Sequence, residues 1–392
     1  MRLKEFRIQE KNNVLQTDLP NVWVELSSSA LQNNLRELRR VIGDKVLVMA
    51  MVKANAYGHG MKEVAPVLER LGVDYFGVNN FEEAKQLRET GCRLPILILS
   101  QVNDNDLRMI NGNNFELVAY SLDYLKKLNQ IALEVKKKFL VHLKIDTGMG
   151  RLGIFMDEIG ELIKLLSSLL GIEVKAVMTH FAASDDPKKK DYFNLQLCNF
   201  QEVLFELQKG GIILPIKHIA NSGAVLLYPE SHFDLVRVGA LLYGFWPSEE
   251  VCKLKSREVK LQPVLSLKTK IVQIKTIKKG NFVGYGCTFE ASSNLKIGII
   301  PVGYFEGYNR LFSNQSEVLV RGKRAKVIGR VSMNLTVVDL TKIPGVEVND
   351  EVVLVGKQGQ DEIDVDELAE KCNTINYEIV TKIAESIPRI II

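Results

Sequence analysis

The sequence predicts an α/β fold: a (β/α)8 TIM-type barrel followed by a C-terminal, mostly antiparallel β domain. Short β-branched or apolar runs recur between about residues 46 and 245, with amphipathic helical segments between them. After Pro263 the pattern changes to alternation of apolar and polar residues with tight turns. A chain of 392 residues, 46% hydrophobic and 25% charged, is long enough for two domains with their own cores.

Eight runs in the first part are strand candidates. The segments between them, such as "FEEAKQLRET" and "EIGELIKLLSSLL", have the i, i+3, i+4 apolar spacing of helices that cover a sheet. Eight β-α units match a (β/α)8 barrel in number and length, although a doubly wound open sheet is the structural alternative. The candidates are residues 46–52, 75–78, 96–99, 116–121, 140–145, 174–179, 217–220 and 234–238.

The second part contains "LSLKTKIVQI", "SEVLVRGKRAKVIGRV", "LTVVDL" and "DEVVLVG", which are typical of antiparallel strands. We expect a single helix to interrupt them near residues 364–372. The short run "VWVEL" at 22–26 precedes the first helix and could pair with either domain. We therefore predict an N-terminal segment over 1–28 of open domain membership, a barrel over 29–255 and a β domain over 256–392.

Charge, cysteine content and hydropathy argue against several classes of protein. Lys and Arg number 51 against 47 Asp and Glu, and the basic runs at 136–138 and 188–190 fit solvated faces better than nucleic-acid binding. The five cysteines are odd in number and contain no C-x-x-C pair, so neither a disulfide framework nor a zinc site is indicated. The first twenty residues have no signal-peptide core, and no apolar run could span a bilayer. We expect a cytoplasmic protein with no membrane partner.

Polar residues follow several of the predicted barrel strands, at the end where a barrel active site lies. Any one of them could be a strand-end group satisfied by backbone, but their convergence indicates a site. They are Lys53 and Tyr57 after the first strand, Lys144, Asp146 and Arg151 after the fifth, His180 after the sixth, Asn221 and Ser222 after the seventh, and Arg237 and Gly239 at the eighth.

The lysine in "MVKANAYGHG" ends a buried run, where desolvation should lower the pKa of Lys53. A neutral amine suits Schiff-base chemistry, and pyridoxal phosphate is the cofactor that most often uses it. The segments "ANSG" at 220–223 and "RVGA" at 237–240 supply a hydroxyl and backbone N–H groups after the last two strands, where barrel phosphate sites are usually built.

The motifs "AMVKANAYGHG", "LKIDTGMGRLG", "THFAASDD", "ANSG", "LVRVGALLYG", "VGYG" and "INYE", in this order, resemble the bacterial alanine racemases across nearly the whole chain. The resemblance implies a fold type III, pyridoxal-phosphate-dependent isomerase. It would be a homodimer with shared active sites, interconverting L- and D-alanine and supplying D-alanine for peptidoglycan.

By this resemblance Lys53 holds the cofactor as an internal aldimine and is the base facing the D-enantiomer, while Tyr285 of the partner subunit serves the L-enantiomer. Racemisation removes the Cα proton from one face and returns a proton to the other, so two bases must flank Cα. A free tyrosine has a pKa near 10. Tyr285 therefore needs nearby positive charge, which His180 with Arg237 behind it could supply.

Arg237 corresponds to the arginine that donates to the pyridine nitrogen, which then stays unprotonated because arginine keeps its proton. Arg151 corresponds to the arginine beside the cofactor's phenolic oxygen and the substrate carboxylate. Lys144 corresponds to a lysine that is carbamylated in several members, which would convert a repelling cation into a carboxylate beside Arg151. The other implied contacts are Tyr57, His180, Ser222, Gly239, Ala240 and Tyr377 for the cofactor, and Tyr304 and Met333 for the substrate.

Two segments depart from the family pattern at the expected substrate entrance. The chain has "GYFEG" at 303–307, where many members have Gly-Tyr-Ala-Asp-Gly, and "MNL" at 333–335, where they have Met-Asp-Gln. Phe305, Glu306 and Asn334 therefore bear on substrate preference more than on cofactor binding. A racemase of other small amino acids, a barrel-domain decarboxylase and a pyridoxal-phosphate-binding protein without turnover remain as alternatives.

Overall fold

The computed structural model describes residues 20–110 and 115–392, so most of the predicted N-terminal segment lies outside the described residues. The described chain forms two compact units. The barrel unit contains residues 25–265, 374–385 and 389–392, and the β unit contains residues 20–24, 266–373 and 386–388. Segments distant in sequence are thus grouped in one unit, and the domain limits taken from the sequence stay a proposal.

Eight parallel strands form the core of the barrel unit, in the order β8-β7-β6-β5-β4-β3-β2-β9. Backbone hydrogen bonds from Asp234 N to Lys217 O (3.1 Å) and from Arg237 N to Ala220 O (3.0 Å) join β8 to β9 and nearly close the ring. The barrel prediction is confirmed, and the open doubly wound alternative is wrong. The strands are β2 (Leu47–Met51), β3 (Tyr75–Val78), β4 (Ile96–Ile98), β5 (Phe115–Ala119), β6 (Phe139–Lys144), β7 (Ile172–Met178), β8 (Ile216–His218) and β9 (Leu235–Val238).

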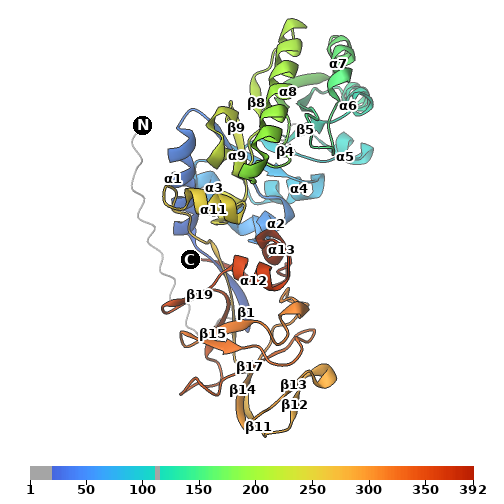
Figure 1. Cartoon of the computed structure of the whole chain (residues 1–392). Coiled ribbons are helices and arrows are strands. Elements are labelled where there is room, and N and C mark those ends of the chain that lie inside the picture. The colour runs from blue at the N-terminus through green and yellow to red at the C-terminus, as the bar shows by residue number, and fades with distance from the viewer. Residues whose placement is uncertain (1–19, 111–114) are drawn as a thin grey trace. The chain divides into compact units, whose positions relative to one another are not determined.

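Helices surround these strands, as Figure 1 shows. Their starts follow from local chemistry: Ser27 accepts a hydrogen bond from Ala30 N, and Ser121 accepts one from Tyr124 N, each at 3.1 Å. They are α1 (Ser28–Ile42), α2 (Lys53–Tyr57), α3 (Met61–Leu71), α4 (Phe81–Glu89), α5 (Asp104–Met109), α6 (Leu122–Glu134), α7 (Ile159–Leu166), α8 (Lys190–Lys209), α9 (Ser222–Leu227), α10 (Ala240–Tyr243) and α11 (Glu249–Lys255).

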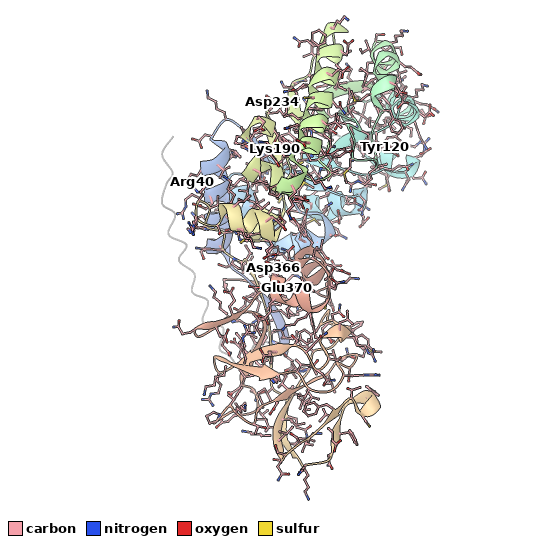
Figure 2. All side chains as sticks on the ribbon, viewed as in Figure 1. Arg40, Tyr120, Lys190, Asp234, Asp366 and Glu370 are labelled. Atoms are coloured by element: carbon pink, nitrogen blue, oxygen red, sulfur yellow. The ribbon has the colours of Figure 1, made fainter. Side chains whose placement is uncertain are left out.

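Apolar and charged side chains separate as the strand and helix periods require. Methionines and aliphatic residues from several strands, such as Met49, Leu97 and Val118, fill the barrel interior. Charged side chains such as Arg40 and Lys190 are exposed (Figure 2). The basic runs at 136–138 and 188–190 are likewise exposed, as predicted. Among the described residues, no helix is both long and apolar enough to cross a membrane.

The β unit is built from antiparallel pairs. β15 pairs with β16 and β18, and β18 also pairs with β10 and β19, while β11-β14-β17 and β12-β13 form separate smaller sheets. The chain passes between the units within β1 (Val22–Leu26), which lies next to β10. The strands are β10 (Leu265–Lys270), β11 (Gln273–Ile277), β12 (Phe282–Val283), β13 (Phe289–Glu290), β14 (Leu295–Ile300), β15 (Glu317–Val320), β16 (Lys323–Lys326), β17 (Thr336–Asp339), β18 (Glu351–Gln358) and β19 (Asp361–Ile363). The last strand, β20 (Arg389–Ile391), belongs to the barrel unit.

The expectation of a single helix in the C-terminal part was wrong in number. Helix α12 (Val365–Lys371) is present where predicted, but α13 (Asn376–Thr381) follows it and belongs to the barrel unit. With six residues, α13 is too short to show a helical repeat in the sequence.

Candidate active site

The barrel unit contains a cavity of about 400 Å³ at the carboxyl ends of its strands. Its size is within the usual range for small-molecule sites. It brings together eleven of the residues singled out from the sequence: Lys53, Tyr57, Lys144, Arg151, His180, Asn221, Ser222, Arg237, Gly239, Ala240 and Tyr377.

Lys53 directly follows β2 and begins α2. Burial, followed by the nearby charge of Arg151, lowers the pKa of Lys53, while Glu83 opposes that shift. The sequence-based expectation of a desolvated lysine is therefore met. A lysine in this state has a larger fraction of neutral, nucleophilic amine than a lysine in water.

The α2 segment is a left-handed turn and not an ordinary helix. Ala54, Asn55, Ala56 and Tyr57 all have φ between 52° and 55°. Such a conformation costs roughly 1–2 kcal/mol for each non-glycine residue, so surrounding groups must hold it. The turn carries Lys53 at its start and Tyr57 at its end, and it aims both into the cavity.

Side chains from outside the turn satisfy its backbone. Glu83 accepts the Ala54 N–H at 2.7 Å, and Arg389 donates to Gly58 O at 2.9 Å. His59 is buried, and its Nδ1 contacts the carbonyl oxygens of Ala56 and Tyr57 at 3.0 Å. His59 thus orders this loop. No local sequence pattern points to Glu83, because it lies 29 positions along the chain from its partner.

Positive charge dominates the cavity. Burial and then the charges of Arg151 and Arg237 lower the pKa of Lys144 to about 8. Lys53 adds to the same effect. Such a set of cations favours anionic ligand groups, since unpaired cations close together repel one another.

Asp146 shapes the loop that carries Arg151. Its carboxylate accepts the backbone N–H groups of Gly148, Met149, Gly150 and Arg151 at 2.8–3.1 Å. Burial alone would raise the pKa of Asp146, but these donors outweigh it and hold the pKa below its usual value. The sequence placed Asp146 at a strand end without indicating this role.

Arg237 is fixed by protein acceptors on both terminal nitrogens. Nη1 donates to Nδ1 and O of His218, and Nη2 donates to the carbonyl oxygens of Thr179 and Ile219 and to His180 Nδ1, at 2.8–3.1 Å. Burial lowers the pKa of Arg237 to about 10, which still leaves the guanidinium charged at neutral pH. Its Nε–H has no acceptor among the described residues, so this donor remains for a ligand in the cavity.

His180 is neutral in this setting. Burial, and then the charges of Arg237 and Arg151, hold the pKa of His180 well below its usual range. We expected His180 and Arg237 together to supply positive charge for a phenolate. Of these two groups only Arg237 is charged, and the His180 imidazole accepts a hydrogen bond from it.

Another part of the cavity lining is suited to a phosphate. Ser222 and Gly223 begin α9 and Ala240 begins α10, where the first N–H groups have no intrahelical acceptor. Glycine is required at 239, because a Cβ there would lie 2.6 Å from Tyr57 Oη. Burial raises the pKa of Tyr57 to about 12, so its hydroxyl keeps its proton and can donate.

Three predicted residues, Tyr285, Tyr304 and Met333, lie in the β unit and do not line this cavity. Tyr285 is 72% exposed, Tyr304 43% and Met333 54%. The loops carrying Tyr304 and Met333 are joined, since Tyr304 N donates to Ser332 O and Phe305 N donates to Met333 O. The departures from the family pattern contact each other here: Asn334 Nδ2 donates to Glu306 Oε1 at 2.7 Å.

The fold and the cavity together define a class of protein: a barrel enzyme whose site combines a desolvated lysine with groups for a phosphate and other anions. Residues 26–247 of the polypeptide match the family model "Alanine racemase, N-terminal domain", and residues 264–391 match "Alanine racemase, C-terminal domain". The chain belongs to the alanine racemase family.

Individual relatives cover almost the whole chain. Alanine racemase 2 of Caldanaerobacter subterraneus is 43% identical over 94% of this chain and 94% of its own length. The structure of the Bacillus anthracis alanine racemase with bound L-Ala-P has a TM-score of 0.90 and 34% identity, covering 95% of both chains. The Bartonella henselae alanine racemase with covalently bound pyridoxal phosphate has a TM-score of 0.84 and 27% identity, covering 95% of this chain and 100% of the other.

Proposed function

We propose that the protein is an alanine racemase that interconverts L- and D-alanine with pyridoxal 5′-phosphate and supplies D-alanine for peptidoglycan. The observation that carries the proposal is the cavity in which Lys53, with its lowered pKa, lies among cations and phosphate-binding groups. Family membership supports the same reaction. We place the enzyme in the cytoplasm, where its substrate and its free cysteines fit.

The residues present fit the cofactor. The unpaired Arg237 Nε–H suits an unprotonated ring nitrogen, and the amine of Lys53 suits covalent attachment. Ser222, Tyr57, Tyr377 and the backbone of Gly239 and Ala240 line the region suited to the phosphate. When bound, pyridoxal phosphate supplies an electron sink that stabilises negative charge at the substrate Cα.

Two groups of the protein would then move the proton at Cα. Lys53 Nζ takes it from D-alanine and returns it on that face, and Tyr285 Oη serves the opposite face for L-alanine. Arg237 retains its proton, so the cofactor ring is a weaker electron sink than it would be beside a carboxylic acid. This restraint favours return of the proton to Cα over side reactions.

Arg151 would hold the substrate carboxylate, and a carbamate on Lys144 would hold Arg151. With a pKa of about 8, the Lys144 amine is partly neutral near physiological pH and can react with CO₂. The modification removes one of the repelling cations and adds an anion beside Arg151. The Lys144 carbamate is thus a consequence of the crowded positive charge.

The active enzyme would be a homodimer in which the β unit of one protomer completes the cavity of the other. The exposed apolar side chains of the β unit support this proposal, because Phe282, Tyr285, Phe305 and Met333 are each more than half exposed. Large apolar side chains gathered on a surface are typical of association sites. Tyr304 and Met333 would contact the substrate in the completed site.

Solvent-deuterium incorporation tests the reaction and both bases. We expect the wild-type enzyme to exchange the Cα hydrogen of both enantiomers and to invert them. Lys53→Ala should abolish turnover and the cofactor that borohydride traps on the protein, whereas Lys62→Ala, on the exposed side of α3, should do neither. Cofactor binding without any D-alanine formation would contradict the proposal.

A racemase of other small amino acids is the second candidate, and the Asn334–Glu306 contact favours it. This pair replaces an acidic residue of the family pattern by a neutral amide at the proposed entrance. A panel of L-amino acids assayed for their D-forms separates the two candidates. Alanine giving the highest kcat/KM would support the first candidate.

A further inference from the structure

Four buried side chains form a continuous hydrogen-bonded chain inside the barrel, on strands β5, β6, β8 and β9. Glu116 Oε2 lies 2.5 Å from His142 Nε2, His142 Nδ1 lies 2.9 Å from His218 Nε2, and His218 Nδ1 lies 2.9 Å from Arg237 Nη1. Their exposed fractions are 3%, 0%, 0% and 5% in that order. Only Arg237 reaches the cavity.

No local sequence pattern indicates this hydrogen-bonded network, because 76 positions separate His142 from His218. The strand register brings them inside: Val118, in the interior cluster, is paired with His142, and Glu116 lies two residues before Val118 on the same face.

The direction of each hydrogen bond follows from the one between Arg237 and His218. Arginine has only donors, so His218 Nδ1 must accept from Arg237. A neutral imidazole then has its proton on Nε2, and His218 Nε2–H donates to His142 Nδ1. By the same rule His142 Nε2–H donates to Glu116.

A positive charge on either histidine would place two N–H donors against each other. Burial, and then the charge of Arg237, hold the pKa of His218 well below its usual range, which agrees with a neutral ring. The hydrogen-bonded series of four side chains then has a cation, Arg237, at one end and a carboxylate, Glu116, at the other. A buried guanidinium is costly unless a counter-charge and hydrogen bonds compensate it. Glu116 provides the counter-charge through two neutral rings, and His218 accepts a hydrogen bond from Arg237.

We propose that Glu116, His142 and His218 are positioning residues, which fix Arg237 and balance its charge so that its Nε–H stays available to the cofactor ring nitrogen. The proposal rests on the proposed function for the ligand of that Nε–H. The hydrogen bonds from Glu116 to Arg237 themselves form without the cofactor. A flipped His218 would turn an N–H toward Arg237 Nη1 and displace the guanidinium.

Nitrogen-15 NMR of the histidine rings tests the hydrogen-bonded series of side chains directly. The protein contains five histidines, so each ring signal can be assigned. We expect His142 and His218 to be neutral Nε2–H tautomers, with and without pyridoxal phosphate. Glu116→Gln retains an acceptor oxygen and removes the charge, whereas Glu116→Leu removes both. His232→Gln is the matched control, because His232 is also buried but contacts the Val225 carbonyl.

In Glu116→Leu we expect His142 to lose its fixed tautomer and the Kd for pyridoxal phosphate, from absorbance titration, to rise at least tenfold. Glu116→Gln should keep the tautomers and raise the Kd by a smaller factor, and His232→Gln should leave both unchanged. With alanine, kcat should fall in the Glu116 variants while KM changes little.

Any other tautomer of His142 or His218 in the wild-type protein overturns the proposal, even where Glu116→Leu does not fold. A Kd within twofold of wild type in a folded Glu116→Leu protein overturns it as well. Both measurements need no substrate, so they are independent of whether alanine is the substrate. Failure of the racemase assay alone would leave this inference in place.

Discussion

Asp146 offers the sharpest test of how this site is held together. Its Oδ1 accepts N–H groups from Gly148 (2.9 Å), Met149 (2.8 Å) and Gly150 (3.1 Å), and its Oδ2 accepts the N–H of Arg151 (3.1 Å). Asp146→Asn preserves the shape of the side chain. Its amide oxygen can keep the first three contacts, but its NH₂ group faces the N–H of Arg151, and two donors cannot bond.

The expected loss of stability follows from these four contacts. Hydrogen bonds to charged groups contribute about 1.5–3 kcal/mol and neutral ones about 0.5–1.5 kcal/mol, and an unsatisfied buried donor costs about 1–3 kcal/mol. Because part of the loop is exposed, water replaces some of the loss. We expect Asp146→Asn to lower the free energy of unfolding by about 2–4 kcal/mol.

Asp146→Asn should also lower the catalytic activity, since the loop that Asp146 holds carries Arg151. A displacement of this arginine by about 1 Å should lower kcat/KM with alanine on the order of 100-fold. The exposed Asp157 lies in the segment just after this loop, and Asp157→Asn is the matched control, expected to leave both quantities unchanged.

The effect should depend on pH with a defined sign. The pKa of Asp146 is lowered in the folded protein, so its contribution is present above the unfolded pKa of about 3.9 and is lost as pH falls through the folded pKa. Urea unfolding of wild type and variant at pH 7 and below pH 4 measures this. A difference under about 0.5 kcal/mol at pH 7, or one that does not shrink in acid, would refute the reasoning.

Three other substitutions test separate features. Gly58→Ala should lower the free energy of unfolding by about 2–5 kcal/mol, because the φ of Gly58 is 79° and a Cβ would lie 1.9 Å from Val380 O. Gly72→Ala, at φ 93° with open space around it, should lower stability less in thermal unfolding, and equal losses of stability would contradict the steric cause. Tyr285→Phe should abolish deuterium exchange from L-alanine while exchange from D-alanine continues without inversion; equal loss for both enantiomers would contradict the two-base assignment. Carbon-13 NMR with labelled bicarbonate should show a carbamate that Lys144→Ala lacks and that increases as pH rises through about 8, where the amine loses its proton; crystal density ending at the amine would contradict it.

The strand pattern of the barrel could be predicted closely because each strand is a short apolar run between amphipathic helices. Tyr75–Val78 was predicted to the residue, and Leu47–Met51 lies within the predicted 46–52. Helix α13 was missed because its single short turn has no periodic signal. Eleven of the residues that line the cavity were predicted from their places at strand ends and from the family motifs, whereas others, such as Asn79 and Asp185, were not.

The sequence by itself determined the fold class, the family and the desolvated lysine at the end of the first barrel strand, since period and motif are local properties of a chain. Only the tertiary structure decided what holds that chemistry in place: the left-handed turn after Lys53, the neutral state of His180 and the chain from Glu116 to Arg237. Each of these depends on burial and on hydrogen bonds between residues far apart in the sequence. Such contacts leave no local pattern, because the barrel register alone brings the partners together.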